Sequence, residues 1–150
     1  ITGENLQKTG HNMLKINSDK VHAKVNLKKV HEFLDDLNNY KYLFPKNKIS
    51  NWESTTSSCS LKIQQLYTID LIKISSTPNS IVLKSGDKTS FKFDMQIDLE
   101  NTDLDLTTAQ ISCQVDLNPA LKMMVSKPLN ELFNYMANRI EKAILSDELD

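Results

Sequence analysis

The sequence predicts an α+β domain in which a long C-terminal amphipathic helix packs against an antiparallel sheet. The middle of the chain alternates apolar and polar residues over several short segments. This is the period of strands with one buried face. The C-terminal part instead repeats apolar residues every three or four positions, as a helix does. Short turns between the alternating segments favour antiparallel pairing, because parallel strands need long crossover connections.

The N-terminal part of this domain is predicted to form a strand followed by two helices. Residues 21–25 alternate apolar with polar side chains and indicate the first strand. Asn26 stands at a helix N-cap position, and residues 27–37 carry the apolar stripe of a helix. After a break, a second and shorter helical segment ends at Pro45.

The remaining strands follow in the middle of the chain, giving a sheet of about six or seven strands. The clearest is residues 91–99, which have one entirely apolar face and one entirely polar face. Residues 111–117 repeat the pattern. The other strands are predicted over residues 49–53, 59–64, 67–75 and 81–85.

The last helix is predicted to begin at Asn118-Pro119, an N-cap residue followed by a proline at the first helical position. Pro128 lies inside the helix, where it removes one backbone hydrogen bond and favours a kink. The apolar stripe consists of Leu121, Met124, Val125, Leu129, Leu132, Phe133, Met136, Ile140 and Ile144.

Length and composition fit one ordinary globular domain. The chain has 150 residues, 39% hydrophobic and 25% charged, and a net charge of −1. This balance gives no general attraction to nucleic acid, and no apolar run is long enough for a membrane span. Cys59 and Cys113 are interpreted as buried free thiols, which suits a reducing cytoplasm, with a disulfide or a reactive thiol as the alternatives. Residues 1–12 lack periodicity and are interpreted as a tag, linker or disordered tail before a single domain over residues 13–150.

The sequence contains no recognisable catalytic or metal-binding motif. No metal-ligand spacing of His or Cys is present, so no metal or other cofactor is expected. Three glycines, scattered along the chain, provide no phosphate-binding loop. His22 and His31, and the acidic pair Asp35-Asp36, are expected on the solvated surface.

Four segments carry a resemblance to a known family. Residues 25–34 are similar to its strand-into-helix entry, and residues 40–45 to its aromatic segment closed by proline. Residues 51–53 and 116–119 stand where its second strand and its last helix boundary are expected. Over nearly all of residues 13–146 the chain resembles the START-like (SRPBCC) superfamily, which includes polyketide cyclases, the birch pollen allergen and lipid-transfer domains.

The resemblance implies a helix-grip fold, in which a curved sheet wraps around the last helix and leaves a cavity between them. Such a cavity often binds or carries a small hydrophobic molecule such as a lipid, a quinone or an aromatic compound. The alternative is that the same apolar residues form solid core. The candidate lining residues are Cys59, Leu61, Tyr67, Phe91, Phe93, Met95, Cys113, Met124, Phe133 and Met136.

Two other functions stay open. Some relatives are cyclases, hydrolases or dehydratases, and Asp70, with Tyr67 and Gln65 beside it, is the weak candidate for a catalytic acid in the pocket. The chain could also act as a protein-interaction module through its surface, including as a homodimer. An exposed apolar patch outside the groove would favour that function.

Overall fold

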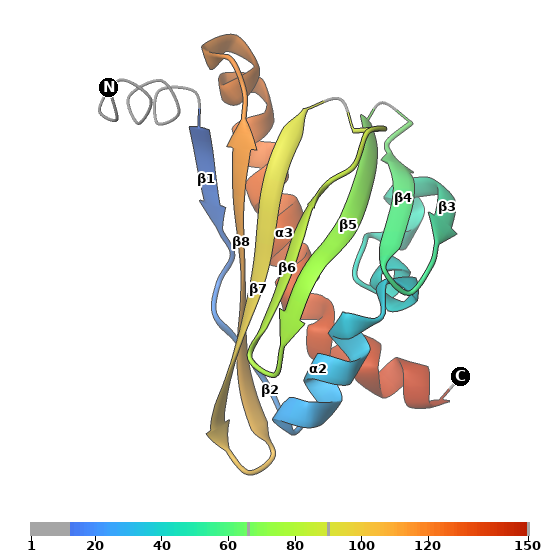
Figure 1. Cartoon of the computed structure of the whole chain (residues 1–150), viewed down its shortest axis with the longest axis vertical. Helices are drawn as coiled ribbons and strands as arrows, with labels where there is room; N and C mark the ends of the chain where they lie inside the picture. The colour runs from blue at the N-terminus through green and yellow to red at the C-terminus, as the bar shows by residue number, and fades with distance from the viewer. Residues whose placement is uncertain (1–12, 66, 90, 150) are drawn as a thin grey trace.

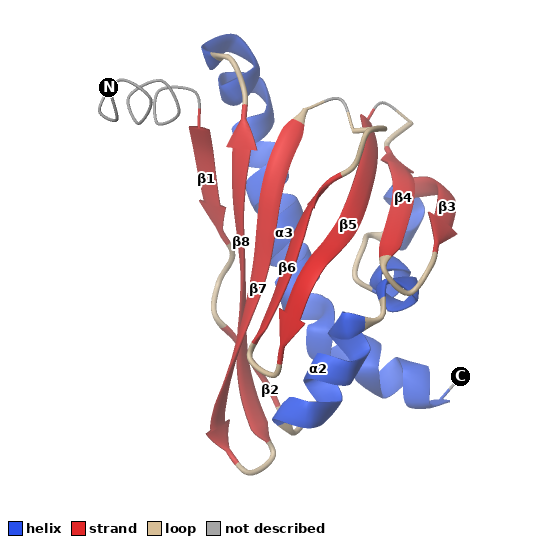
Figure 2. Cartoon of the chain, viewed as in Figure 1, coloured by secondary structure: helices blue, strands red, loops and turns tan. Residues whose placement is uncertain are grey.

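The computed structural model of the chain describes residues 13–65, 67–89 and 91–149. Within these residues, eight strands form one antiparallel sheet, and the long helix α3 (Pro119–Leu149) passes behind it (Figure 1). Figure 2 shows these two layers, with the strands in front and the helix behind. The predicted α+β architecture is confirmed. Residues 1–12, for which we expected a tag, linker or tail, lie outside the described residues.

The order of elements also agrees with the prediction, from a strand and short helices through the sheet to the long helix. Three helical segments, of which the η segments are 3-10 turns, separate β2 from β3. The elements before α3 are β1 (Met13–Asn17), β2 (Val21–Ala23), α2 (Leu27–Asp35), η1 (Leu37–Tyr42), η2 (Lys46–Lys48), β3 (Ile49–Ser54), β4 (Ser58–Ile63), β5 (Tyr67–Thr77), β6 (Ser80–Ser85), β7 (Lys92–Asp103) and β8 (Leu106–Asp116).

The predicted first strand corresponds to β2, and an additional strand that was not predicted, β1, precedes it; both pair with β8. Between them lies the buried Ser18, whose hydroxyl accepts a hydrogen bond from the Ile111 amide at 2.9 Å. The Ser18 amide in turn donates to the Ile111 carbonyl at 2.8 Å. These bonds keep the backbone polar groups satisfied where the strand is interrupted. The additional strand β1 brings the sheet to eight strands in the described chain.

Helix α2 begins at its predicted N-cap, because the Asn26 side chain accepts from the Lys29 amide at 2.9 Å. At its other end, the Tyr40 hydroxyl donates to the Leu34 carbonyl at 2.7 Å, and Asn39 donates to the Phe33 carbonyl at 2.9 Å. The last carbonyls of a helix have no partner within it. The break and the following 3-10 turn therefore supply the C-terminal cap of α2.

The strands follow the order β1-β8-β7-β6-β5-β4-β3, so β3 to β8 form a meander and β1 closes one edge. The long hairpin of β7 and β8 pairs from Lys92 with Asp116 down to Asp103 with Leu106. Along β7 the inward side chains Phe93, Met95, Ile97 and Leu99 are all buried, whereas the residues between them are exposed. This alternation gives the sheet one apolar face, and α3 covers it.

Helix α3 begins as predicted, since the Asn118 side chain accepts from the Leu121 amide at 2.9 Å. From Leu129 onward its apolar stripe is buried against the sheet, except for the half-buried Leu132. The first two turns differ from the prediction, because Leu121 and Met124 are 42% and 68% exposed. In Figure 1 this end of α3 projects beyond the end of the sheet, which explains why no strand covers these side chains.

Candidate functional site

A pocket of about 370 Å³ opens between α3 and the sheet, at the end where the β4–β5 turn and the start of β7 lie. It is the same end at which α3 projects beyond the strands (Figure 1). The helix contributes one wall, and η2 with the start of β5 contributes the other. Its lining consists of Pro45, Asn47, Lys48, Ile63, Gln64, Tyr67, Ile69, Phe91, Val125, Pro128, Leu129, Glu131, Leu132 and Tyr135.

The floor of this pocket leads to a second, much smaller cavity of about 20 Å³ deeper between sheet and helix. The two share four lining residues, Ile69, Phe91, Leu129 and Leu132. A space of about 20 Å³ is close to the size of one water molecule. The deep interior is therefore packed core, and the room for a small molecule lies in the outer pocket.

Most of the predicted lining residues gather around the inner cavity. Phe91 lines both spaces, and its ring lies 6.1 Å from that of Phe93, centroid to centroid. Tyr67 lines the outer pocket. The predicted residues around the inner cavity are Phe91, Phe93, Met95, Cys113, Phe133 and Met136. They come together because alternate positions of β7 and β8 face the same stripe of α3.

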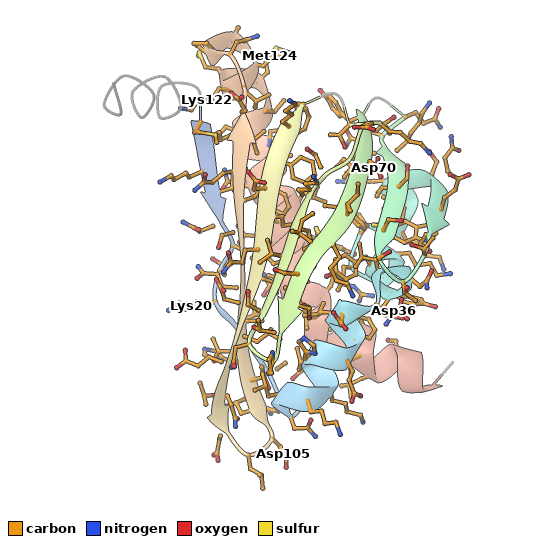
Figure 3. The ribbon with its side chains drawn as sticks, viewed as in Figure 1. Lys20, Asp36, Asp70, Asp105, Lys122 and Met124 are labelled. Atoms are coloured by element: carbon orange, nitrogen blue, oxygen red, sulfur yellow. The ribbon has the colours of Figure 1, made fainter. Side chains whose placement is uncertain are left out.

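Three predicted lining residues lie elsewhere. Cys59 and Leu61 are buried in the core at β4 but line neither of these two spaces. Met124 is a correction, because it lies on the projecting end of α3 with 68% of its surface exposed. Its side chain belongs to the outer surface of the molecule (Figure 3).

The rim of the outer pocket is polar, whereas its floor is apolar. Lys48, Gln64 and Glu131 belong to the lining, and all three are exposed. Tyr67 and Tyr135 are 39% and 40% exposed, so each combines an aromatic wall with a hydroxyl near solvent. An apolar floor with a few polar groups around it is typical of sites for small molecules.

The backbone at this rim has an uncommon conformation. Gln64 and Gln65 have φ angles of 54° and 60°, in the left-handed region that residues other than glycine rarely adopt. The Gln64 amide donates to the Lys48 carbonyl at 2.7 Å, which ties the β4–β5 turn to η2. This bond holds two separate parts of the pocket wall together.

Both cysteines are buried free thiols, as expected. Burial, with a smaller contribution from the charge of Asp94, raises the pKa of the Cys113 thiol to about 12. Burial, with a smaller contribution from Asp70, raises the pKa of Cys59 to about 12 as well. Thiolates are the reactive form, so neither cysteine is suited to nucleophilic chemistry in the folded protein.

Asp70 does not face the pocket. Its neighbours Ile69 and Leu71 are buried on the inner face of β5, so alternation puts Asp70 on the outer face. Its carboxylate there accepts from the Lys88 amide at 3.4 Å, and its main-chain amide donates to the Thr89 hydroxyl at 2.8 Å. Asp70 therefore shapes the turn between β6 and β7, and the hypothesis of a catalytic acid in the pocket is wrong for this residue.

The other polar residues considered in the sequence have structural partners. His22 Nδ1 lies 3.0 Å from the Thr108 hydroxyl, and His31 Nε2 lies 2.8 Å from that of Ser76. Asp35 is not simply solvated, because it forms an ion pair with Lys73 at 3.0 Å. Among the described residues no group of three or more His, Cys, Asp or Glu side chains is arranged to hold a metal ion. No helix in this part of the chain is both long and apolar enough to cross a membrane.

The prediction missed several residues of the outer pocket. Leu129 and Leu132 were assigned to the buried stripe of α3, and their spacing from Phe133 and Met136 placed them on the correct face. No pattern in the sequence indicated that Pro45 and Lys48 line a pocket. They reach it only because η2 packs beside the β4–β5 turn.

Neither the protein families nor the curated proteins compared with the sequence gave a match. Solved structures do match over most of the chain. A START superfamily protein from Mycobacterium smegmatis has a TM-score of 0.69 at 16% identity, covering 92% of this chain and 99% of its own. A point mutant of Thalictrum flavum norcoclaurine synthase, in complex with a transition-state analogue, has a TM-score of 0.71 at 12% identity, covering 91% and 96%.

A third match is the di-domain ARO/CYC BexL from the BE-7585A biosynthetic pathway, with a TM-score of 0.69 at 15% identity. It covers 95% of this chain and 53% of the BexL chain. Another structure of norcoclaurine synthase, at 12% identity and a TM-score of 0.67, holds dopamine and hydroxybenzaldehyde and covers 89% of this chain and 87% of its own. Together these structures establish the START-like helix-grip fold for this chain.

Proposed function

We propose that the chain binds a small, largely apolar molecule in the pocket between α3, η2 and the start of β5. The observation that carries this proposal is a pocket of about 370 Å³ with an apolar floor and a polar rim. Its volume falls within the range of about 300–1,000 Å³ typical of small-molecule sites. The fold supports the proposal, since START-like domains usually bind hydrophobic ligands.

The shape of the pocket favours an aromatic or other compact ligand over a long acyl chain. The inner cavity of about 20 Å³ leaves no room for a chain to extend deeper between sheet and helix. Phe91, Tyr67 and Tyr135 offer ring surfaces against which a flat ligand can pack. Norcoclaurine synthase, which shares the fold, has been solved with two small aromatic compounds.

The test fills the pocket with a side chain. Leu132 lines both the outer pocket and the inner cavity and is half-buried. Leu132→Trp therefore places a bulky indole ring in the pocket without removing a fully buried core residue. The probe is 1-anilinonaphthalene-8-sulfonate, whose fluorescence reports binding to apolar pockets. We expect Leu132→Trp to weaken its binding at least about tenfold, which corresponds to about 1.4 kcal/mol.

The matched control is Leu104→Trp, the same substitution at an 80% exposed site in the β7–β8 turn. It should leave binding of the probe unchanged. Native mass spectrometry of protein purified from cells should also detect a bound small molecule that Leu132→Trp removes. Equal binding by wild type and Leu132→Trp, together with protein that carries no small molecule, would contradict the proposal.

A further inference from the structure

The first turns of α3 expose three large apolar side chains at one end of the molecule. Leu121, Met123 and Met124 are 42%, 85% and 68% exposed, and no strand of the described chain covers them. Figure 3 shows Met124 and Lys122 at the projecting end of α3, beyond the strands. We call this surface, made of Leu121, Lys122, Met123, Met124 and Lys127, the α3 tip.

The α3 tip is continuous with the mouth of the pocket. Met124, Pro128 and Leu132 are spaced four residues apart, so they follow one another along the same side of the helix. Pro128 and Leu132 line the pocket, and Met124 lies one turn before them. An apolar surface therefore runs from the exposed end of α3 directly to the pocket entrance.

The charge of the α3 tip is positive, although the chain as a whole carries −1. Between Asp116 and Glu131 the sequence contains no acidic residue, and it contains two lysines, Lys122 and Lys127. Exposed apolar side chains beside lysines supply the two contributions to binding at an anionic membrane surface, which are buried apolar area and attraction to anionic lipids. The charge complements the negative surface of such a bilayer.

The same residues fit a protein partner less well. Residues 117–130 contain no Trp, Tyr or Arg, which are the side chains that dominate binding at protein interfaces. We propose that the α3 tip docks on the surface of an anionic lipid bilayer, with its apolar side chains at the acyl boundary and its lysines at the headgroups.

The test measures flotation of the full chain with vesicles of phosphatidylcholine alone or mixed with phosphatidylserine. The chain should bind the mixed vesicles, bind phosphatidylcholine vesicles more weakly, and lose binding as salt rises. The double variant Met123→Glu/Met124→Glu should weaken binding to mixed vesicles at least about tenfold. The double variant Lys122→Gln/Lys127→Gln should also weaken it, by roughly fivefold for each lysine.

The matched control is Ile74→Glu/Leu104→Glu, which makes the same charge change at two other exposed apolar residues. These residues lie at or near the hairpins at the opposite end of the sheet, so the control should bind as wild type does (Figure 1). Equal loss in the control, or no binding of wild type to mixed vesicles, would overturn the proposal. A dimer in sedimentation velocity that Met123→Glu/Met124→Glu dissociates would overturn it too, because the surface would then bind a second copy.

Docking and ligand binding are separable in these measurements. Binding of 1-anilinonaphthalene-8-sulfonate reports the pocket, and flotation reports the α3 tip. Met123→Glu/Met124→Glu should keep the thermal unfolding midpoint of the wild type, because both side chains are exposed. Loss of flotation with unchanged probe binding would therefore assign the effect to the surface alone.

Discussion

The carboxylate of Asp70 occupies the space that a β-carbon on Gly86 would need, where the start of β5 meets the end of β6. The Gly86 amide also donates to the Asp70 carbonyl at 2.8 Å, so the two backbones are held close together. A side chain at position 86 would therefore force the Asp70 carboxylate to move. The pair illustrates how a residue considered for catalysis instead shapes a turn.

Gly86→Ala should therefore destabilise the fold by about 1–3 kcal/mol, because the new methyl group overlaps the Asp70 carboxylate. In an Asp70→Ala background the same substitution should cost less, since the obstructing carboxylate is gone. Urea unfolding of the four proteins measures this coupling. Additive effects of the two substitutions would contradict the steric explanation. Asp70→Ala alone should leave probe binding in the pocket unchanged.

The ion pair between Asp35 and Lys73 should make stability depend on pH in the acid range. Burial opposes ionisation of Asp35, but hydrogen bonds from Lys73 and Ser76 and the charges of Lys73 and His31 outweigh it and lower the pKa below 3.8. Because the pKa of Asp35 is lower in the folded than in the unfolded state, its ionised carboxylate stabilises the fold at pH values above the unfolded-state pKa. That stabilisation is lost as the pH falls through the folded-state pKa.

The measurement is the free energy of unfolding between about pH 5 and pH 2, a span that brackets the ordinary carboxyl pKa. Asp35→Asn should remove part of the decline at low pH, by about 0.2–1 kcal/mol for a partly exposed pair. In a Lys73→Met background, Asp35→Asn should change the slope much less. If the free energy of unfolding of Asp35→Asn alone depended on pH as in the wild type, this ion pair would not contribute to the pH dependence of stability.

The Tyr40 hydroxyl is predicted to stabilise the end of α2. It is fully buried and donates to the Leu34 carbonyl at 2.7 Å. Tyr40→Phe leaves that carbonyl without its partner, which should cost about 1–2 kcal/mol. Tyr42→Phe, at a half-buried position two residues later, should cost less than half as much. If Tyr40→Phe and Tyr42→Phe lowered the free energy of unfolding equally, as measured by thermal and urea unfolding, the cap would be contradicted.

The two thiols should react only when the protein opens. Burial raises the pKa of both Cys59 and Cys113 to about 12, so thiolate is scarce at neutral pH and reagents cannot reach it. We expect no reaction with Ellman's reagent in the folded protein and two thiols per chain in urea. Fast reaction of Cys113 in the folded state would mean that the inner cavity opens to solvent.

Local patterns in the sequence were sufficient to predict most of the fold. Asn26 and Asn118 each cap the helix that follows, and the alternation from Phe91 to Leu99 predicts which face of β7 is buried. These features depend on hydrogen bonds and side-chain periods within a few residues, which is why they can be read without a structure. The strand β1 was missed, because its place in the sheet depends on pairing with the distant β8.

The sequence by itself therefore determined the order of elements from β2 onward, both helix starts and the apolar faces that form the core. Tertiary structure alone decided where those faces end. Met124 continues the stripe of α3 but is exposed, because the helix extends past the strands that would cover it. Asp70 faces outward, and Pro45 and Lys48 line a pocket with Leu132, because these positions depend on how distant segments pack together. Periodicity indicates which side of an element is apolar, and only packing determines what lies against that side.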